Sequence, residues 1–130
     1  MTLLAVDHLS IANRTRHGTF TAVDDVSFAL EKGTSMGIVG ESGCGKTTIG
    51  MGLLRLLPSN GFIQSGSIRF AGSELLSLSA AQMRMVRWTK MSMIFQAAMN
   101  AWNPVKRVGA QIVEAIRTHY PETSRESAEK

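Results

Sequence analysis

The sequence predicts an α/β fold that opens with two β-strands and continues into a strand–loop–helix unit, and three observations support this prediction. Leu3 to Ile11 and Phe20 to Leu30 are rich in apolar and β-branched residues, and a polar turn separates them. A short apolar run, Met36 to Val39, leads into a glycine-rich loop, as a buried parallel strand would. Beyond the loop, the spacing of the apolar residues changes to the period of a helix.

The elements after the loop follow from the same periodicities. Apolar residues share one face from Ile49 to Leu57, which predicts a helix that starts at Lys46 and that Pro58 closes. Gly50 and Gly52 inside this helix indicate close packing against a sheet or a ligand, because each helical glycine costs on the order of 1 kcal/mol relative to alanine. We also expect a strand over 66–70, a helix over 80–88 and a buried strand over 91–95.

The C-terminal part is expected to hold two helices. Asn103 and Pro104 indicate an N-cap followed by proline at the first helical position, with the helix running to about Tyr120. Thr123 and Glu126 have capping-box spacing, which predicts the start of a second helix. The apolar stripe of the first of these helices consists of Val108, Ile112 and Ile116.

Composition indicates one soluble globular domain of ordinary kind. The 130 residues are 44% hydrophobic and 18% charged, which excludes a disordered or fibrous chain. The longest apolar runs fall far short of the roughly 20 residues needed to cross a bilayer. The residues after Met1 contain no basic region and no cleavage site of a signal peptide, so we expect a cytoplasmic chain.

The distribution of charge bears on the binding partners, and the cysteine content bears on the cellular compartment. A net charge of +4 permits binding to nucleic acid or to an anionic membrane, but the lysines and arginines are scattered without a block. We therefore expect an ordinary solvated surface and no nucleic-acid partner. Cys44 is the single cysteine and cannot form an internal disulfide, which favours a reducing compartment.

The glycine-rich segment fits the phosphate-binding pattern G-x-x-x-x-G-K-[ST], with an expected strand before it and an expected helix after it. Passing both tests of context disfavours the alternative, a glycine-rich turn that binds nothing. The glycines allow successive backbone N–H groups to form a concave nest for phosphate oxygens at the N-terminus of the helix. The residues expected to bind the phosphates are Gly40, Glu41, Ser42, Gly43, Cys44, Gly45, Lys46, Thr47 and Thr48.

Individual side chains of this loop have separate expected roles. Lys46 reaches the β- and γ-phosphates, the Thr47 hydroxyl ligates Mg²⁺, and Thr48 supplements the phosphate contacts. Cys44 is interpreted as a small residue at a variable position; the alternative is a reactive thiol, which a helix N-terminus favours.

Three segments resemble the nucleotide-binding subunits of ABC transporters: Thr21 to Phe28, Gly37 to Thr48, and Met93 to Gln96. The resemblance spans nearly the whole chain. Within that family, Gly40 to Gly43 and Asn103 to Val105 are most similar to the oligopeptide, dipeptide and nickel importer ATPases. The resemblance implies a P-loop NTPase core of ABC type, with N-terminal antiparallel β-segments and the start of a helical subdomain.

The resemblance also implies roles for residues outside the loop. Gln96 corresponds to the Q-loop glutamine, which touches Mg²⁺ and the attacking water and links the nucleotide site to the membrane subunits; otherwise it is a polar residue that ends a strand. Lys46 and Gln96 are thus the implied catalytic residues. The family stacks an aromatic ring on adenine, for which His17 and Phe20 are the candidates, although Phe20 is equally well a core residue of its strand.

The family's biology supplies the expected cofactors and partners. They are ATP and Mg²⁺, the transmembrane permease subunits of an importer, and a second ATP-binding subunit in a head-to-tail dimer. Such a subunit lies peripherally on the inner face of the cell membrane and drives uptake of peptides or a similar small solute.

Several family segments do not occur in this sequence. Ala97 to Trp102 replaces the usual residues after the Q-loop glutamine, and there is no Leu-Ser-Gly-Gly-Gln-like signature, no apolar run ending in Asp-Glu after the loop and no switch histidine. We therefore expect a truncated domain, with 1–96 as β-subdomain and P-loop core and 97–130 as the start of the helical subdomain. Such a chain would bind nucleotide with negligible hydrolysis.

Two other interpretations remain open from the sequence. One is a non-catalytic remnant or an incomplete gene product with no transport activity of its own. The other, a nucleotide kinase or GTPase, is disfavoured because the sequence has neither an Asn-Lys-x-Asp segment nor an arginine-rich lid.

Overall fold

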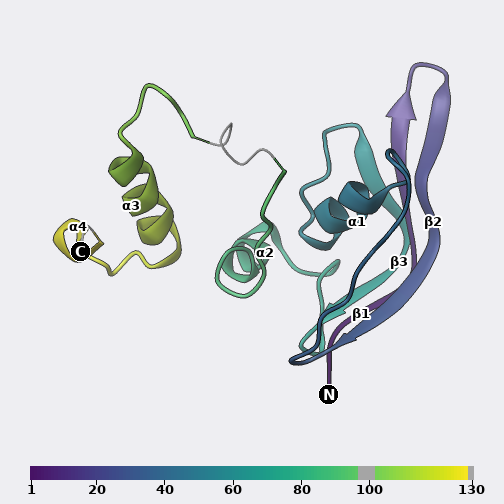
Figure 1. The fold of residues 1–130 in the computed structure, drawn as a ribbon, viewed down its shortest axis with the longest axis horizontal. Coiled ribbons are helices and arrows are strands. Elements are labelled where there is room, and N and C mark those ends of the chain that lie inside the picture. Colours follow the sequence, from purple (N-terminus) through teal and green to yellow (C-terminus); the bar gives the residue numbers. More distant parts are fainter. Residues whose placement is uncertain (97–101, 129–130) are drawn as a thin grey trace. The chain divides into compact units, whose positions relative to one another are not determined.

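The computed structural model describes residues 1–96 and 102–128, which belong to two compact units, Met1–Met83 and Arg84–Lys130 (Figure 1). The division expected near residue 96 concerns subdomains of a complete domain and stays a prediction. Among the described residues, none of the helices has both the length and the apolar character that a bilayer span requires.

An antiparallel sheet dominates the first unit. Strands β1 (Thr2–Thr15) and β2 (Gly18–Glu31) form a long hairpin, which confirms the first two expected strands. Strand β3 (Gly61–Phe70) pairs with the other edge of β1, and β4 (Ser73–Glu74) pairs with β3, so the order is β2-β1-β3-β4. β1 and β3 are therefore the two interior strands, and β1 makes both of the long pairings.

The core of the first unit is built on β1. Val6, Leu9 and Ile11 of β1 are fully buried, as is Ile68 of the neighbouring β3. Burying each such side chain contributes roughly 1.5–3 kcal/mol. Burial alternates along β1 from Leu4 to Val6, whereas Leu9 to Ala12 are all buried.

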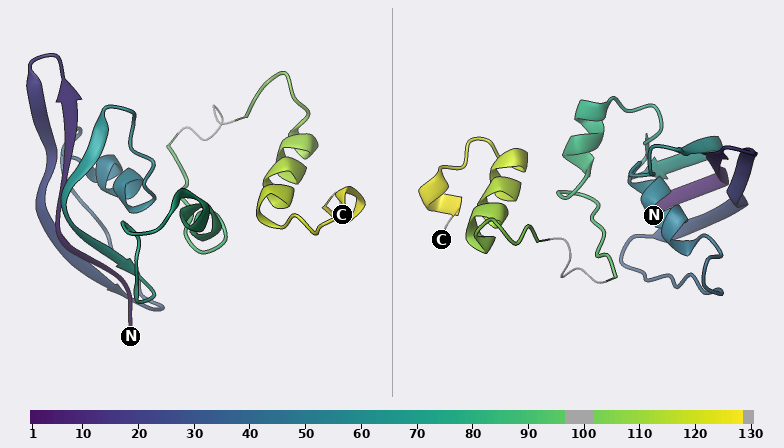
Figure 2. Two further views of the ribbon diagram at one scale, coloured as in Figure 1. Left: turned by 180° about the vertical axis from the view of Figure 1, so that it is seen from behind. Right: turned by 90° about the horizontal axis from the view of Figure 1, so that it is seen from above.

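Helix α1 (Lys46–Leu53) packs on one face of this sheet (Figure 2). The expected close packing at Gly52 is confirmed, because a Cβ there would lie 2.6 Å from Ile11 Cδ1. The helix ends at Leu53, four residues earlier than expected. Arg55 has a left-handed φ of 51°, which no continuing α-helix allows.

The expected buried strand over Met36 to Val39 is wrong. The segment is irregular and exposed, with Val39 95% exposed, and Figure 1 draws it without an arrow. A strand needs a neighbour to satisfy its backbone groups, and all paired strands among residues 1–96 and 102–128 are antiparallel and lie elsewhere. The described residues thus contain the antiparallel β-segments of the expected α/β fold but not its parallel core.

The chain around the boundary of the two units departs from expectation in a similar way. Helix α2 (Ala80–Val86) is confirmed but ends two residues early. The buried strand expected over Met91 to Phe95 is wrong, because only Met91 makes an isolated bridge, to Arg87, and Ile94 is 92% exposed. As at Met36, an apolar run without a pairing partner does not become a strand.

Helix α3 (Val108–His119) begins later than expected. Asn103 closes a turn instead of capping the helix, because its side-chain Oδ1 accepts from Val105 N at 3.0 Å and its carbonyl accepts from Lys106 N at 3.2 Å. The three residues of the apolar stripe lie on this helix, but they are not its buried residues. Val108 and Ile112 are exposed, and Val113 is the buried residue of the helix.

Helix α4 (Arg125–Ala128) is a single turn. Its first turn is capped by Ser124, whose Oγ accepts from Ser127 N at 3.2 Å, rather than by Thr123 as the capping-box spacing predicted. The second C-terminal helix is therefore confirmed, with its cap one residue further along.

Candidate phosphate-binding site

The backbone of the glycine-rich loop is held against β2 at Gly45. A Cβ on this residue would lie 2.7 Å from the carbonyl oxygen of Ala22 and 3.3 Å from Val23 Cγ2. Its φ of 95° is one that L side chains rarely adopt, so both conformation and space require glycine here. The register of the hairpin shifts beside this contact, between Ile11 and Ala12. The β-bulge at Ala22 therefore lies against Gly45 of the loop.

The side chain of Lys46 folds back over the loop. Its Nζ donates to the carbonyl oxygens of Gly40 at 2.7 Å and Glu41 at 2.6 Å, and lies 3.3 Å from Cys44 Sγ. These acceptors come from the start and the middle of the same loop. The ammonium group is therefore held at the loop, where oxygen atoms of a bound anion would replace some of these acceptors.

The loop opens at the N-terminus of α1. Gly45 occupies the N-cap position, no side chain caps the helix, and its first turn carries no acidic residue. The partial positive charge of the helix N-terminus is consequently not offset by a local carboxylate. Together with the Lys46 ammonium, it makes this end of α1 suited to an anion such as phosphate.

The two threonines after Lys46 differ in their surroundings. Thr47 is exposed and Thr48 is half-buried, whereas Ile49 is buried and anchors the first turn to the core. The exposed Thr47 hydroxyl is a hard oxygen ligand beside the anion-binding end of the helix. This donor fits Mg²⁺, which commonly takes one or two protein oxygens and completes its shell with phosphate and water.

Cys44 is packed into the loop although its side chain is exposed. A Cβ on Gly40 would lie 2.6 Å from its Sγ, so these two positions are close neighbours. Glu41 and Ser42 are exposed, and the Glu41 carbonyl also accepts from Cys44 N at 3.3 Å. The small size of Cys44 is compatible with this packing, and its interpretation as a small residue at a variable position stays a prediction.

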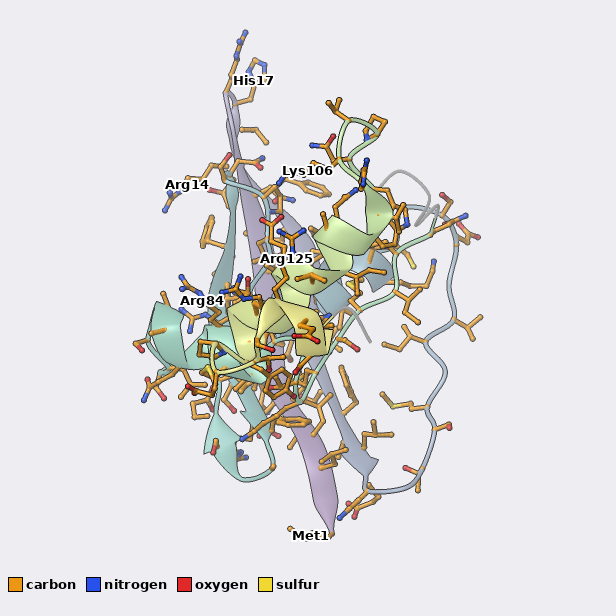
Figure 3. The ribbon with its side chains drawn as sticks, turned by 90° about the vertical axis from the view of Figure 1, so that its left-hand side faces the viewer. Met1, Arg14, His17, Arg84, Lys106 and Arg125 are labelled. Atoms are coloured by element: carbon orange, nitrogen blue, oxygen red, sulfur yellow. The ribbon has the colours of Figure 1, made fainter. Side chains whose placement is uncertain are left out.

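The two candidates for adenine stacking both lie on the β1–β2 hairpin. His17 is at its turn (Figure 3), and Phe20 is 63% exposed on β2, so Phe20 is not a core residue of the strand. Phe20 is two residues from Ala22, whose carbonyl contacts the loop position Gly45. This proximity along β2 favours Phe20 over His17, and stacking itself stays a prediction.

Gln96 belongs to the second unit, whereas the loop belongs to the first. Its side chain is exposed, and its role toward nucleotide stays a prediction. Ala97 to Ala101, which replace the family's usual residues, lie outside the described residues. Within the first unit, the structure brings Gly40 to Thr48 together at the start of α1, with His17 and Phe20 on the hairpin of the same unit.

Sequence reasoning missed the support that β2 gives to the loop. Ala22 and Val23 are 22 or 23 residues away from Gly45 and carry no chemical group that signals a site. Only the resemblance of Thr21 to Phe28 to the family pointed toward this stretch of the chain.

A glycine-rich loop followed by a lysine at a helix N-terminus without a side-chain cap is the arrangement expected of a phosphate-binding loop. Residues 23–129 match the ABC transporter family, and the chain belongs to that family.

Individual relatives support the same assignment. The chain is 43% identical over 117 residues to the oligopeptide transport ATP-binding protein OppD of Salmonella typhimurium, covering 90% of this chain and 35% of that protein. It is 41% identical over 117 residues to OppD of Haemophilus influenzae, with 90% and 36% covered. It is 40% identical over 129 residues to OppD of Bacillus subtilis, with 98% and 36% covered. The chain thus spans little more than a third of these curated relatives.

Proposed function

We propose that the loop from Gly40 to Thr48 binds the triphosphate of ATP. The observation that carries this proposal is the position of Lys46 Nζ, within 2.7 Å of two loop carbonyls at the N-terminus of α1. Phosphate oxygens would replace some of these acceptors, because an ammonium group has three N–H donors and its attraction to an anion exceeds its attraction to a neutral carbonyl. The backbone N–H groups at the start of α1 would hold the remaining oxygens.

Mg²⁺ would be held with the nucleotide by the hydroxyl of Thr47. When bound, the ion supplies neutralisation of the charge on the phosphates. Gln96 is the second protein group that we propose for this role, on the resemblance to the family alone. Phe20, or else His17, would stack on the adenine ring.

The binding proposal is tested by isothermal titration of the chain with ATP and Mg²⁺, and with AMP as a ligand that lacks the β- and γ-phosphates. Lys46→Ala should weaken ATP binding by roughly 10- to 100-fold, the equivalent of the roughly 1.5–3 kcal/mol of a hydrogen bond to a charged group. Lys32→Ala, which removes an exposed lysine at the end of the hairpin, is the matched control. Equal ATP affinity of Lys46→Ala and the unaltered chain would contradict the proposal.

We further propose that the whole protein is the ATP-binding subunit of an ABC importer for peptides or a similar small solute. The relatives named as oligopeptide transport ATP-binding proteins support this. Its partners would be transmembrane permease subunits and a second ATP-binding subunit arranged head to tail, at the inner face of the cell membrane. ATP hydrolysis with Lys46 and Gln96 as catalytic residues would power uptake.

The alternative is that these 130 residues form a nucleotide-binding piece that does not hydrolyse ATP by itself. The absence of a signature segment and of an Asp-Glu run in the sequence favours binding without turnover for this chain alone. We expect no ATPase activity above background. Measurable phosphate release that Lys46→Ala abolishes would refute this expectation.

A further inference from the structure

Arg55 occupies an unusual backbone position at the end of α1. Its φ is 51°, in the left-handed region, two residues after the last helical residue Leu53. Helices commonly end in this conformation with glycine, because a side chain there carries a steric penalty. An arginine at such a position indicates that its side chain makes contacts that offset the penalty.

Those contacts tie the helix to a distant turn of the same unit. Arg55 Nη1 donates to the carbonyl oxygens of Leu75 at 3.1 Å and Leu78 at 2.6 Å. Arg55 is half-buried, so these hydrogen bonds to carbonyls are partly shielded from water. Leu75 is itself fully buried, and its N–H donates to the carbonyl of Ile68 on β3 at 2.7 Å. The turn is therefore fixed to the sheet.

The same turn leads directly into α2. Ser79 N donates to Gln82 Oε1 at 2.8 Å, and Gln82 N donates to Ser79 Oγ at 3.2 Å, which is a reciprocal capping box. Arg55 thus connects the C-terminal end of α1 to the segment that starts the next helix. All of these residues lie within Met1–Met83.

Helix α1 depends on such anchors for its position. It has eight residues, and helices shorter than roughly 12 residues are marginal without tertiary contacts. The loop end is held by Gly45 against Ala22, the last turn by Gly52 against Ile11, and the residue two positions beyond the helix by the hydrogen bonds of Arg55. Without the Arg55 hydrogen bonds, the C-terminal end of α1 would keep only the Gly52 contact, and a shift of this short helix would also shift the loop at its other end.

We propose that Arg55 is a positioning residue for the phosphate loop, acting through α1 without touching the nucleotide. This inference rests on the proposed binding of ATP by the loop. Its reciprocal consequence is that ATP at the N-terminus of α1 stabilises the turn from Leu75 to Leu78, because coupling between two sites acts in both directions.

The test compares Arg55→Gly and Arg55→Lys with the unaltered chain, titrated with ATP and with tripolyphosphate. Glycine accepts the left-handed φ without penalty, so Arg55→Gly removes the side chain while relieving the backbone. It should weaken the binding of both ligands by a similar factor of at least about fivefold, the equivalent of about one hydrogen bond lost between the displaced loop and the phosphates. Arg55→Lys should recover part of the affinity. Arg69→Ala, which removes an exposed arginine paired with Asp7 on the sheet, should bind as the unaltered chain does.

Hydrogen exchange on the unaltered chain provides a readout that does not depend on the variants folding. Deuterium uptake by the amides of residues 76–79 should fall when ATP and Mg²⁺ are added, while uptake at the hairpin turn, residues 16–18, stays constant. Unchanged affinity in Arg55→Gly, or unchanged exchange at 76–79 in the presence of bound ATP, would overturn the inference and leave ATP binding standing. Failure of the unaltered chain to bind ATP would instead remove the proposed function on which the inference rests.

Discussion

Strand β1 and the segment from Met36 to Val39 are both apolar, yet only one of them is part of a sheet. β1 has antiparallel partners on both sides, and Leu9 and Ile11 within it are fully buried. The segment from Met36 to Val39 has no paired strand among residues 1–96 and 102–128, and Val39 is almost fully exposed. The difference teaches that hydrophobicity selects candidate strands, whereas pairing partners decide which of them form.

The largest predicted effect is a loss of stability when a buried side chain of β1 is truncated. Leu9→Ala removes a fully buried side chain and should lower the free energy of unfolding by about 2–5 kcal/mol. Val39→Ala removes an exposed side chain and should change it by less than about 0.5 kcal/mol. Urea denaturation followed by circular dichroism measures both. Equal effects of the two substitutions would mean that Val39 is buried in solution and that the segment is paired.

The next effect concerns the contact that joins the sheet to the loop. Gly45→Ala adds a Cβ 2.7 Å from the Ala22 carbonyl and also strains a positive φ. Gly43→Ala strains a similar φ of 82° but meets nothing within 4 Å, so it is the control for conformation alone. Both should destabilise by roughly 1–2 kcal/mol through the left-handed backbone, and Gly45→Ala by more. Indistinguishable denaturation midpoints would show that β2 does not support the loop.

A smaller effect sharpens the comparison at the helix that packs on β1. Gly52→Ala gains about 1 kcal/mol of helix propensity but crowds Ile11, and overpacking a core costs about 1–3 kcal/mol. A net loss is expected. Gly109→Ala in α3 adds a Cβ in open space and should be neutral or stabilising. Thermal unfolding measures the melting temperature of both variants. A higher melting temperature for Gly52→Ala than for the unaltered chain would mean that α1 does not pack against Ile11.

The smallest effect lies at the open end of the β1–β2 hairpin. The N-terminal ammonium group, and then the Thr2 hydroxyl, donate to Glu31 and lower the pKa of its carboxyl below the ordinary 4.5. Because the folded pKa is the lower one, this stabilisation is present above about pH 4.5 and is lost as the pH falls through the folded pKa. Above that pH, Glu31→Gln should melt at a lower temperature than the unaltered chain. Below it, the difference between the two melting temperatures should become smaller. A constant gap from pH 6 to pH 3 would contradict the assignment.

Local signals accounted for much of the fold. The hairpin of β1 and β2, the start of α1 at Lys46 and the helix from Ala80 could all be predicted, because alternation, turn residues and helical period act over short distances. The positions at which helices end were harder to predict from the sequence. The early stop of α1 depends on Arg55 reaching carbonyls 20 and 23 residues away, and no local pattern encodes such a contact.

The candidate site shows the same division. The loop residues followed from a motif with a known mechanism, and the folding of Lys46 onto the Gly40 carbonyl agrees with it. The bulge at Ala22 that supports Gly45 could not be predicted, because it depends on the register between two strands. The strands expected at Met36 and Met91 do not form because no strand pairs with them among the described residues. The residues around each segment do not reveal whether such a pairing partner exists.

The most direct test of the central claim is an NMR titration of the isotope-labelled chain with ATP and Mg²⁺. The account predicts that the backbone amide signals of residues 43–48 shift in a saturable way in the unaltered chain and do not shift in Lys46→Ala at the same concentrations. Saturable shifts that leave residues 43–48 unmoved, or identical shifts in Lys46→Ala, would contradict the assignment of the loop as the phosphate site.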